Sequence, residues 1–401
     1  MITKETIDYA IKNIFQKPAR SFLTILSIFV GIATIFIFIS FGLGLYDYVD
    51  SFATSSTADK LIIEGRGGAA PGTSGVILDE RDVVAIERTR GVLEAAGVYF
   101  RGAQAIQKRE SRFIFAIGFA ENDRHLLEES FNIELVTGRF FRDNSFDVIL
   151  GYNYQFDDRV FPRKFSLNDR ITINDVSLRV VGFYSPIGNP IDDANVYVSE
   201  ETFKRLYPSD DPTYSLIIAR ADINQLEQAI DRVERNLARS RGEVLGRETF
   251  TVTSFIEQLE AFSASLNIVV GFIILIAFIS IIVSAINTAN TMVTSVLERV
   301  QEIGVLKSIG AKNKDIFAIF LLESSFLGLI AGIIGVLLGF GISSLAGALL
   351  LELGWGFLQP LYTPTLFIGL LCFATVVGAI SGVIPALDAS KKKPVDALRA
   401  E

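Results

Sequence analysis

Residues 21–45 read SFLTILSIFVGIATIFIFISFGLGL and contain no Asp, Glu, Lys or Arg. Three other stretches are almost as free of charge: 261–297 and 361–387 have no charged residue, and 316–351 has only Glu323. A helix rises 1.5 Å per residue, so about 20 residues cross the roughly 30 Å of bilayer hydrocarbon. Each stretch is longer than that, and the sequence therefore predicts four transmembrane helices.

The composition of the whole chain agrees with this segregation of apolar and charged residues. Of the 401 residues, 50% are hydrophobic and 20% are charged, and the mean hydropathy is +0.41. An ordinary soluble enzyme is less apolar on average. The first stretch has a longer apolar core than a cleaved signal peptide and lacks a small-residue cleavage site, so it is expected to remain as a membrane span.

Basic residues in short flanking segments predict the orientation, because Lys and Arg resist translocation. They occur in the N-terminal arm, in segment 298–315 and in the tail: Lys4, Lys12, Lys17, Arg20, Arg299, Lys307, Lys312, Lys314, Lys391, Lys392, Lys393 and Arg399. The short loop 352–362 has neither Lys nor Arg. We therefore expect a multi-pass protein of the cell membrane with both termini in the cytoplasm.

The expected fold class is a membrane protein with four transmembrane α-helices and a large α+β extracytoplasmic domain inserted between helices 1 and 2. The predicted parts are a cytoplasmic N-terminal amphipathic arm (1–20), helix 1 (21–45), the extracytoplasmic domain (46–260), helix 2 (261–297), a cytoplasmic coupling segment expected to be a helix (298–315), helix 3 (316–351), a short outer loop (352–362), helix 4 (363–387) and a cytoplasmic tail (388–401). The outer domain has a net charge of about −10, which argues against nucleic acid as a partner. Cys372 is the only cysteine, so no intramolecular disulfide can form.

Within the outer domain, strand-like and helical runs alternate. Asp79 precedes a helical pattern that includes Val83 and Ile86, and residues 222–241 form an amphipathic helical pattern with Leu226, Ile230, Val233 and Leu237 on one face. DRITINDVSLRVVGF is typical of a hairpin that turns at Asn174 and Asp175. The strand and helix pairs in 59–92 and 214–241 are expected to pack side by side in one subdomain, with the central strands in another.

Residues 298–316, which are the coupling segment and the first residue of helix 3, read ERVQEIGVLKSIGAKNKDI. An apolar stripe at helical spacing consists of Val296, Val300, Ile303 and Leu306, and the polar side has Glu298, Gln301 and Glu302. The two glutamates at i,i+4 spacing would repel by about 0.2–0.5 kcal/mol, which a basic partner surface would offset. By its residues alone, the segment is more typical of a solvated juxtamembrane helix, and this interpretation is favoured over a helix that binds a partner.

This segment resembles the coupling segment of MacB/FtsX-type ABC transporter permeases, whose pattern is close to ERxxEIGxxKxxGA. The matching positions are Glu298, Arg299, Glu302, Ile303, Gly304, Lys307, Gly310 and Ala311. The opening KPARSFLTILSIFVGIA, the closing GVIPALDASKKKPVDALRAE and the outer-domain runs VTGRFF, DVILG, VVGFYSP and NVYVSEETF resemble the family in the same order. Asp388 departs from the pattern, since many relatives have a basic or neutral residue there.

The resemblance implies a permease subunit that dimerises, as a homodimer or heterodimer, and binds a cytoplasmic ABC ATPase through residues 298–311. ATP would bind the partner subunit, so this chain would need no cofactor and would not itself be an enzyme. Movement of the outer domain would serve export or extraction of a lipoprotein, peptide or small hydrophobic compound. The alternative is an FtsX-like signalling scaffold that activates an extracellular partner such as a cell-wall hydrolase. A periplasmic adaptor or lipoprotein is a further possible partner.

Two features of the third span leave their roles open. Glu323 lies about 12 Å into the span, where it costs a few kcal/mol unless it contacts protein or water. It would either link the spans to the coupling segment or hydrogen-bond Ser or Thr across the bundle, and the second is favoured. Small residues recur at four-residue spacing, namely Gly328, Gly332, Gly335 and Gly339, then Ser343 and Gly347. They permit close helix contact, either within the chain or in a dimer.

Motifs for nucleotide hydrolysis and metal binding are missing from the sequence. No GxxxxGK[ST] occurs, so hydrolysis is expected on another chain. His125 is the only histidine, which excludes a histidine-based metal cluster or catalytic triad within one chain. The pairs Asp157–Asp158 and Asp192–Asp193 are more typical of solvated loop charges than of a calcium site.

Overall fold

The computed structural model describes residues 18–52, 57–67, 75–143, 145–208 and 213–392. The predicted N-terminal arm up to residue 17 and the tail from residue 393 lie outside the described residues. The chain divides into two compact units. A helical unit comprises residues up to Leu45, Leu266–Ala348 and the residues from Pro360, and an outer-domain unit comprises Tyr46–Ser265 and Leu349–Gln359.

Four of the described helices are long and apolar enough to cross a membrane. They are α2 (Pro18–Phe52), α7 (Phe255–Glu298), α9 (Asn313–Glu352) and α10 (Pro364–Lys391). Helices α2, α7 and α9 extend past both ends of their charge-free stretches and α10 past its C-terminal end, which is tolerated because charged side chains at helix ends can reach the headgroup region. At 1.5 Å per residue, the 44 residues of α7 measure about 66 Å, twice the hydrocarbon thickness.

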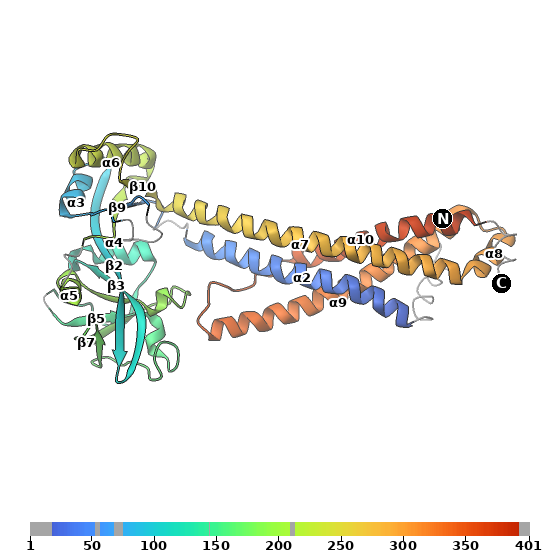
Figure 1. Cartoon of the computed structure of the whole chain (residues 1–401), viewed down its shortest axis with the longest axis horizontal. Helices are drawn as coiled ribbons and strands as arrows, with labels where there is room; N and C mark the ends of the chain where they lie inside the picture. The colour runs from blue at the N-terminus through green and yellow to red at the C-terminus, as the bar shows by residue number, and fades with distance from the viewer. Residues whose placement is uncertain (1–17, 53–56, 68–74, 144, 209–212, 393–401) are drawn as a thin grey trace. The chain divides into compact units, whose positions relative to one another are not determined.

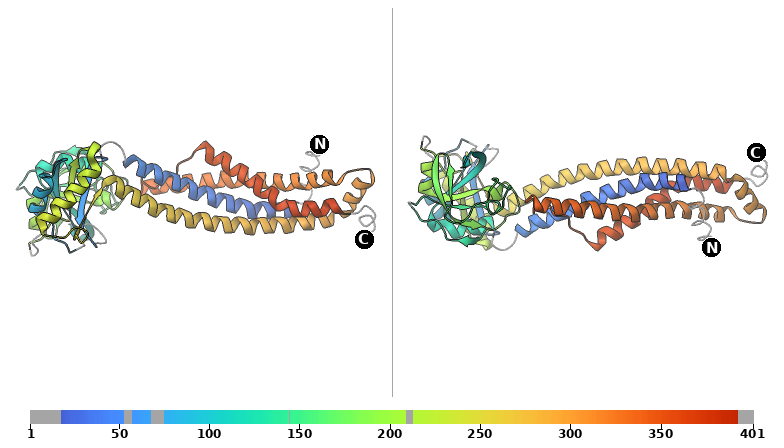
Figure 2. Two further views of the ribbon diagram at one scale, coloured as in Figure 1. Left: turned by 90° about the horizontal axis from the view of Figure 1, so that it is seen from above. Right: turned by 90° about the horizontal axis from the view of Figure 1, so that it is seen from below.

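In the helical unit, α2, α9 and α10 lie side by side (Figure 2), and their side chains share an apolar core. Ile32 and Phe36 of α2 are buried against Ala331 and Val336 of α9 and against Ala374 of α10. At the start of α10, Pro364 occupies the first turn and the Thr363 side chain accepts a hydrogen bond from the Leu366 amide, a combination favoured at helix N-termini.

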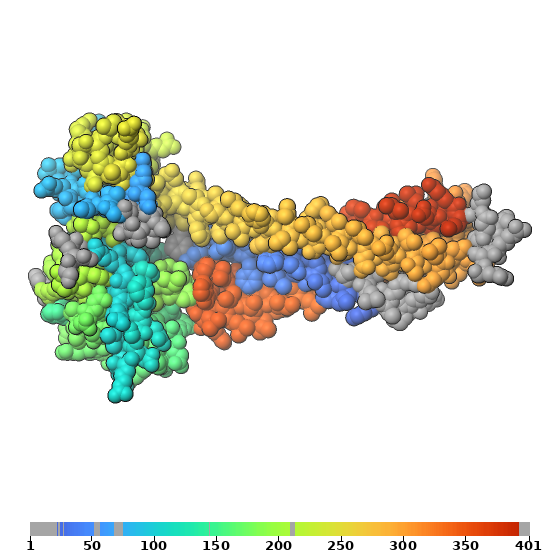
Figure 3. Space-filling view, in the orientation of Figure 1, coloured from blue at the N-terminus to red at the C-terminus, as the bar shows by residue number. Residues whose placement is uncertain are grey.

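Helix α7 is the least covered of the four. Only 11% of its most apolar 18-residue stretch is buried within the chain, whereas the buried share of the corresponding stretch is 33–39% in the other three helices. Phe272, Ile276 and Val283 are more than 60% exposed, and α7 (yellow to orange) lies uncovered along the face turned to the viewer in Figure 3. Such a surface is suited to lipid or to another transmembrane helix.

The outer domain contains a ten-stranded mixed sheet in the order β10-β1-β9-β2-β3-β8-β5-β7-β4, with β6 paired to β2 and β7. The strands are β1 (Lys60–Gly65), β2 (Val92–Gln107), β3 (Glu110–Phe119), β4 (Leu135–Gly138), β5 (Asp147–Leu150), β6 (Arg170–Ile173), β7 (Val176–Tyr184), β8 (Val196–Ser199), β9 (Leu216–Ala221) and β10 (Phe250–Ser254). Helices α3 (Glu80–Glu87), α4 (Arg124–Phe131), α5 (Glu200–Leu206) and α6 (Leu226–Arg241) accompany them, with 3₁₀ helices η1 (Glu121–Asp123), η2 (Tyr152–Gln155), η3 (Asp192–Ala194) and η4 (Ile223–Gln225).

Strand β2 joins two subdomains. Its first half pairs with β9, which also pairs with β1, and α3 packs on α6 beside these strands (Figure 1). The expected pairing of the two strand and helix units is thus confirmed. The Asp79 side chain caps α3 in a reciprocal capping box with Asp82. Consecutive residues such as Ile217 and Ile218 belong to different apolar clusters because side chains alternate between the two faces of a sheet.

The second half of β2 pairs with β3 and β6 in the central subdomain. Strands β6 and β7 form the predicted hairpin, in which Ile173 pairs with Val176. The two turn residues, Asn174 and Asp175, have φ angles of 44° and 66°. Both values lie in the left-handed region, which Asn and Asp tolerate and which a two-residue hairpin turn requires.

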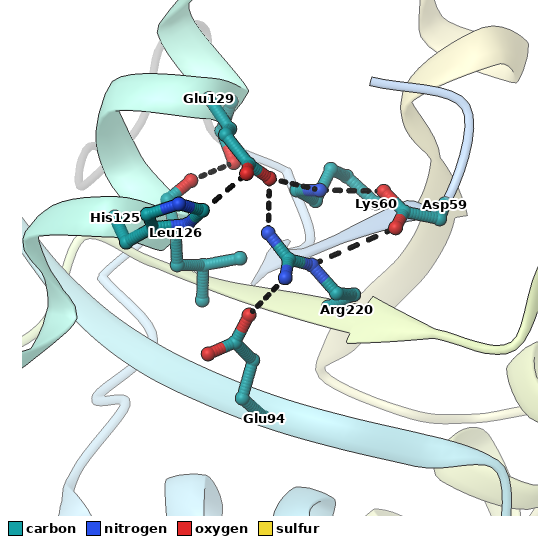
Figure 4. A network of polar contacts seen from close by, with 8 residues as sticks. Asp59, Lys60, Glu94, His125, Leu126, Glu129 and Arg220 are labelled. Atoms are coloured by element: carbon teal, nitrogen blue, oxygen red, sulfur yellow. Dashed lines mark hydrogen bonds and ion pairs between the residues drawn. The ribbon is translucent and has the colours of Figure 1, made fainter. Parts of the chain in front are cut away.

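A network of ion pairs connects α4 to β1, β9 and β2 (Figure 4). Lys60 of β1 is 1% exposed and its Nζ lies 3.1 Å from Oε2 of Glu129 on α4 and 2.5 Å from Oδ1 of Asp59. Arg220 of β9 also contacts Glu129, and its Nη1 lies 3.0 Å from Glu94 of β2. The buried ammonium is therefore compensated, as burial of a charge requires.

Candidate functional site

The coupling segment forms a bend between two spans. Helix α7 ends at Glu298, a short helix α8 covers Val300–Ser308, and α9 begins at Asn313. The expected coupling helix over residues 298–315 is therefore too long at both ends. Gly310 has φ +105°, and the Ala311 amide donates to the Leu306 carbonyl at 3.0 Å. This pattern ends a helix at a residue in the left-handed region, where glycine is favoured.

Arg299 lies at the break between α7 and α8, and its side chain is only 10% exposed. Its Nη1 donates to Oε2 of Glu323 on α9 at 3.0 Å, and its Nε donates to Oε2 of Glu302 on α8 at 2.9 Å. The guanidinium carbon also lies 5.4 Å from the centre of the Phe320 ring, within cation–π range. One cation thus connects the coupling segment to the third span.

Glu323 is 5% exposed, and its contact with Arg299 shows that the favoured prediction of its role was wrong. The sequence favoured a hydrogen bond to Ser or Thr, but the carboxylate forms an ion pair with Arg299. A buried carboxylate needs a compensating charge or several hydrogen-bond donors. Arg299 supplies that charge. It also pairs with Glu302, which removes the need for a basic partner surface to offset repulsion between the glutamates.

Lys307 fixes the other end of α8. Its Nζ donates to the Ser390 and Lys392 carbonyls at 2.7 Å each, at the C-terminal end of α10, and to Oδ1 of Asn313 at 2.8 Å. Carbonyls at a helix C-terminus lack intrahelical donors and carry partial negative charge, so a lysine there satisfies both needs. Helix α8 is therefore attached to α9 through Arg299 and to α10 through Lys307.

The apolar stripe faces the spans. Ile303 is 2% exposed and packs with Val296, Ile316 and Phe320, and Leu306 is half-buried against the same cluster. Gly304 is buried as well.

The opposite side of α8 is exposed and has both charged and apolar side chains. Glu302 has a side chain 54% exposed, Val305 is 50% exposed and Ile309, which follows the helix, is 78% exposed. Val305 and Ile309 are surface residues of the site that the sequence pattern did not identify. Their positions outside the apolar stripe could have indicated that these apolar side chains are exposed. Of the eight residues taken from the resemblance, Glu298, Glu302 and Gly310 are exposed, Lys307 and Ala311 are half-buried, and Arg299, Ile303 and Gly304 are buried.

The small residues of α9 pack within the chain. A Cβ on Gly328 would lie 2.5 Å from the Ala374 carbonyl oxygen, and one on Gly332 would lie 2.8 Å from the Ala374 Cβ, so both face α10. A Cβ on Gly335 would meet the Phe29 carbonyl oxygen of α2 at 2.8 Å, and one on Gly339 would meet α2 at 2.9 Å. These glycines permit the close contact of α9 with its two neighbours.

The described residues contain no group of three or more His, Cys, Asp or Glu side chains that could hold a metal ion. Asp193 is 3% exposed and accepts hydrogen bonds from the Ile187 and Gly188 amides at 2.7 and 3.1 Å. Burial raises its pKa to about 6, and the neighbouring Asp192 adds to the shift. Asp193 is thus a buried loop anchor and not the solvated charge that the sequence suggested.

Two family models match the chain. The MacB-like periplasmic core domain matches residues 21–236, more than half of the chain, and the FtsX-like permease C-terminal model matches residues 274–394. Segment 298–311, with the bend and α8, falls within the second match.

Curated relatives align over nearly the whole chain. The uncharacterized ABC transporter permease MJ1507 of Methanocaldococcus jannaschii is 29% identical over 405 residues, which cover 100% of this chain and 99% of the relative. The uncharacterized ABC transporter permease YvrN of Bacillus subtilis is 28% identical, with 99% and 100% covered. The macrolide export ATP-binding/permease protein MacB of Acinetobacter baylyi is 26% identical over 99% of this chain and 60% of its own length.

Four spans, a large domain after the first of them and the two family matches agree with one another. Because the match to one model alone covers more than half of the residues, the chain belongs to the MacB-type family of ABC transporter permeases, multi-pass membrane proteins with an extracytoplasmic MacB-like domain between the first and second spans.

Proposed function

We propose that this permease couples ATP hydrolysis on a separate ATPase subunit to movement of its extracytoplasmic domain, for export or extraction of a lipoprotein, peptide or small hydrophobic compound. Membership of the family implies the ATPase partner and the membrane setting. The coupling segment, both termini and the ATPase are on the cytoplasmic side in this proposal. The match to a MacB-like core domain supports transport over the signalling-scaffold alternative.

The observation that carries the proposal is the double attachment of α8. Its exposed side offers Val305 and Ile309 to a partner, while Arg299 and Lys307 hold its two ends on α9 and α10. A force applied to α8 therefore reaches the spans without first deforming a flexible loop. Exposed apolar side chains beside charged ones are typical of a protein interface.

Chain connectivity supports a mechanical route from this segment to the outer domain. Helix α7 runs unbroken from Phe255 to Glu298, and β10 ends at Ser254, directly before it. The Ser254 hydroxyl oxygen accepts a hydrogen bond from the Glu257 amide at 3.0 Å, so the junction is itself ordered. Strand β10 pairs with β1, the first strand after α2. A shift of α7 against α2 would thus act on two paired strands.

The test is co-purification of the full-length permease with its ATPase and measurement of ATPase stimulation. Val305→Glu and Ile309→Glu place a charge on exposed positions, so we expect normal membrane insertion but loss of ATPase association. Leu93→Glu is the matched control, because Leu93 is 69% exposed in the outer domain. Unchanged association of both α8 variants would overturn the coupling role.

Glu302→Lys is expected to weaken ATPase association while membrane insertion stays intact. Because Glu302 also accepts a hydrogen bond from Arg299, Glu302→Gln should be measured beside it. Glu302→Gln keeps an oxygen acceptor for Arg299 and removes only the charge, so equal loss in both variants would mean that the negative charge itself is required and that its reversal adds nothing.

Dimerisation, with the same or a different permease, is part of the proposal and is supported by the uncovered face of α7. In a Cys372→Ser background, Phe272→Cys on α7 should form a disulfide between copies in membranes. Ile368→Cys on α10 is the control, since Phe272 and Ile368 are 66% and 63% exposed. Equal crosslinking at both positions would contradict the assignment of the dimer contact to α7.

A further inference from the structure

A cavity in the outer-domain unit is unrelated to the coupling segment. It has a volume of about 400 Å³, and its lining includes Tyr48, Tyr152, Arg159, Asp193 and Leu351, together with three glycines. This volume lies in the range of small-molecule sites, roughly 300–1,000 Å³. Nothing in the proposed function uses the cavity.

The cavity walls are held in place by hydrogen bonds between segments distant in sequence. The Tyr48 hydroxyl donates to the Ile187 carbonyl at 3.1 Å, and the Phe357 amide donates to the Gly188 carbonyl at 3.0 Å. A Cβ on Gly356 would lie 3.4 Å from the Gly188 Cα, so the loop between α9 and α10 packs directly on residues 186–190. These contacts within the chain order the cavity walls, and an ordered site lowers the entropic cost of binding.

Arg159 is the charged side chain of the cavity lining that can donate hydrogen bonds to an anion. Its Nη1 donates to Oδ1 of Asn153 at 3.0 Å, and its guanidinium lies 4.1 Å from the centre of the Phe156 ring. Asn153 is anchored in turn through a 3.4 Å hydrogen bond to the Pro190 carbonyl. Among the described residues, no carboxylate lies within ion-pairing distance of Arg159. A guanidinium has five N–H donors, so most of them remain for a ligand.

Asp193 also lines the cavity, and the charge of Arg159 partly offsets the rise in its pKa, although these two described side chains are not within ion-pairing distance. Its two carboxylate oxygens accept hydrogen bonds from the Ile187 and Gly188 amides of its own loop. A planar guanidinium recognises carboxylate and phosphate through paired hydrogen bonds, and phosphate is the common anion of membrane surfaces.

The lining and its position in the chain select a lipid over a soluble anion. Tyr48 belongs to the span Ile28–Ser51, and Leu351 belongs to the span Asn313–Glu352, each within a few residues of its outer end. In the proposed topology, these outer ends lie near the headgroup level of the outer leaflet. Tyrosine rings favour this level because one end is apolar and the other polar. We propose that the cavity binds the phosphate-bearing headgroup of an outer-leaflet phospholipid, with Arg159 contacting the phosphate.

Trp355 is the only tryptophan of the chain and lies in the loop that closes the cavity, with its ring 5.6 Å from that of Phe357. Its fluorescence in the purified full-length protein can therefore follow titration with a short-chain phosphatidylglycerol below its micellar concentration. We expect a saturable change, at least tenfold weaker binding in Arg159→Gln, and a smaller loss in Arg159→Lys, which keeps the charge but not the planar fork. Arg205→Gln is the matched control, because Arg205 also lies over a phenylalanine ring, 5.0 Å from the centre of Phe146, but does not line the cavity.

Three results would overturn the proposal. The first is unaltered binding in Arg159→Gln with an unchanged melting temperature. The second is equal binding of a short-chain diacylglycerol, which lacks phosphate. The third is full competition by millimolar inorganic phosphate, which would make the cavity a phosphate site and not a lipid site. The measurement needs no ATPase, so its outcome is independent of the coupling experiment.

Discussion

The ion pair between Arg299 and Glu323 allows a quantitative test of how the coupling segment is attached. Both side chains are almost fully covered, with 10% and 7% exposed, and the two atoms are 3.0 Å apart. Removal of one partner of a buried pair leaves an uncompensated charge and typically costs about 3–5 kcal/mol. We therefore expect Arg299→Met to lower the free energy of unfolding of the permease by about 3–5 kcal/mol.

The second partner gives a smaller effect. Glu323→Gln leaves Arg299 with its contact to Glu302, so we expect a loss of about 1–3 kcal/mol, the usual cost of a buried polar group that loses a partner. The double variant Arg299→Met/Glu323→Met removes both charges, and apolar replacement of a whole pair is often neutral or stabilising. Its stability should therefore exceed that of Arg299→Met alone.

Unfolding in mixed detergent micelles measures these differences, with ATPase stimulation recorded on the same preparations. The double variant should fold but stimulate the ATPase less. It lacks the contact between α8 and α9, while Lys307 still connects α8 to α10. Glu302→Gln is the stability control, since a carboxylate 54% exposed contributes less than about 1 kcal/mol through an ion pair. A loss below about 1 kcal/mol in Arg299→Met, or a double variant no more stable than it, would refute the reasoning.

Three further outcomes are expected. Gly328→Ile should lower the melting temperature, at a cost of about 1–3 kcal/mol, because its Cβ would lie 2.5 Å from a carbonyl oxygen of α10; Gly341→Ile, which has nothing within 4 Å, should not, and equal effects would contradict the packing role. Glu129→Ala should destabilise the outer domain by about 1–3 kcal/mol, because Lys60 would lose one of its carboxylate partners, and hydrogen exchange should rise in β1. Asp193 has a pKa raised by burial to about 6 from 3.8, so its contribution to stability is complete below about pH 4 and lost as pH rises through 6; Asp193→Asn should flatten this part of the pH profile measured by thermal unfolding, and an unchanged profile would argue against it.

Local sequence patterns were sufficient wherever the physical cause was itself local. Absence of charge over more than 20 residues excludes a water-exposed helix of that composition and led directly to the four spans. Asn174 and Asp175 indicated the hairpin because few residues tolerate the left-handed region, and Asp79 indicated a helix start because its side chain caps nearby amides. The apolar stripe of α8 likewise predicted that Ile303 would be buried.

Tertiary structure alone decided the contacts between distant residues. Arg299 and Glu323 are 24 positions apart, and no periodicity distinguishes their ion pair from a hydrogen bond between Glu323 and a serine. The small residues of α9 were compatible with a dimer until Gly328 and Gly335 were found against α10 and α2. Hydropathy and spacing report what each segment prefers to contact, whereas the identity of the contact depends on which segments the folded chain brings together.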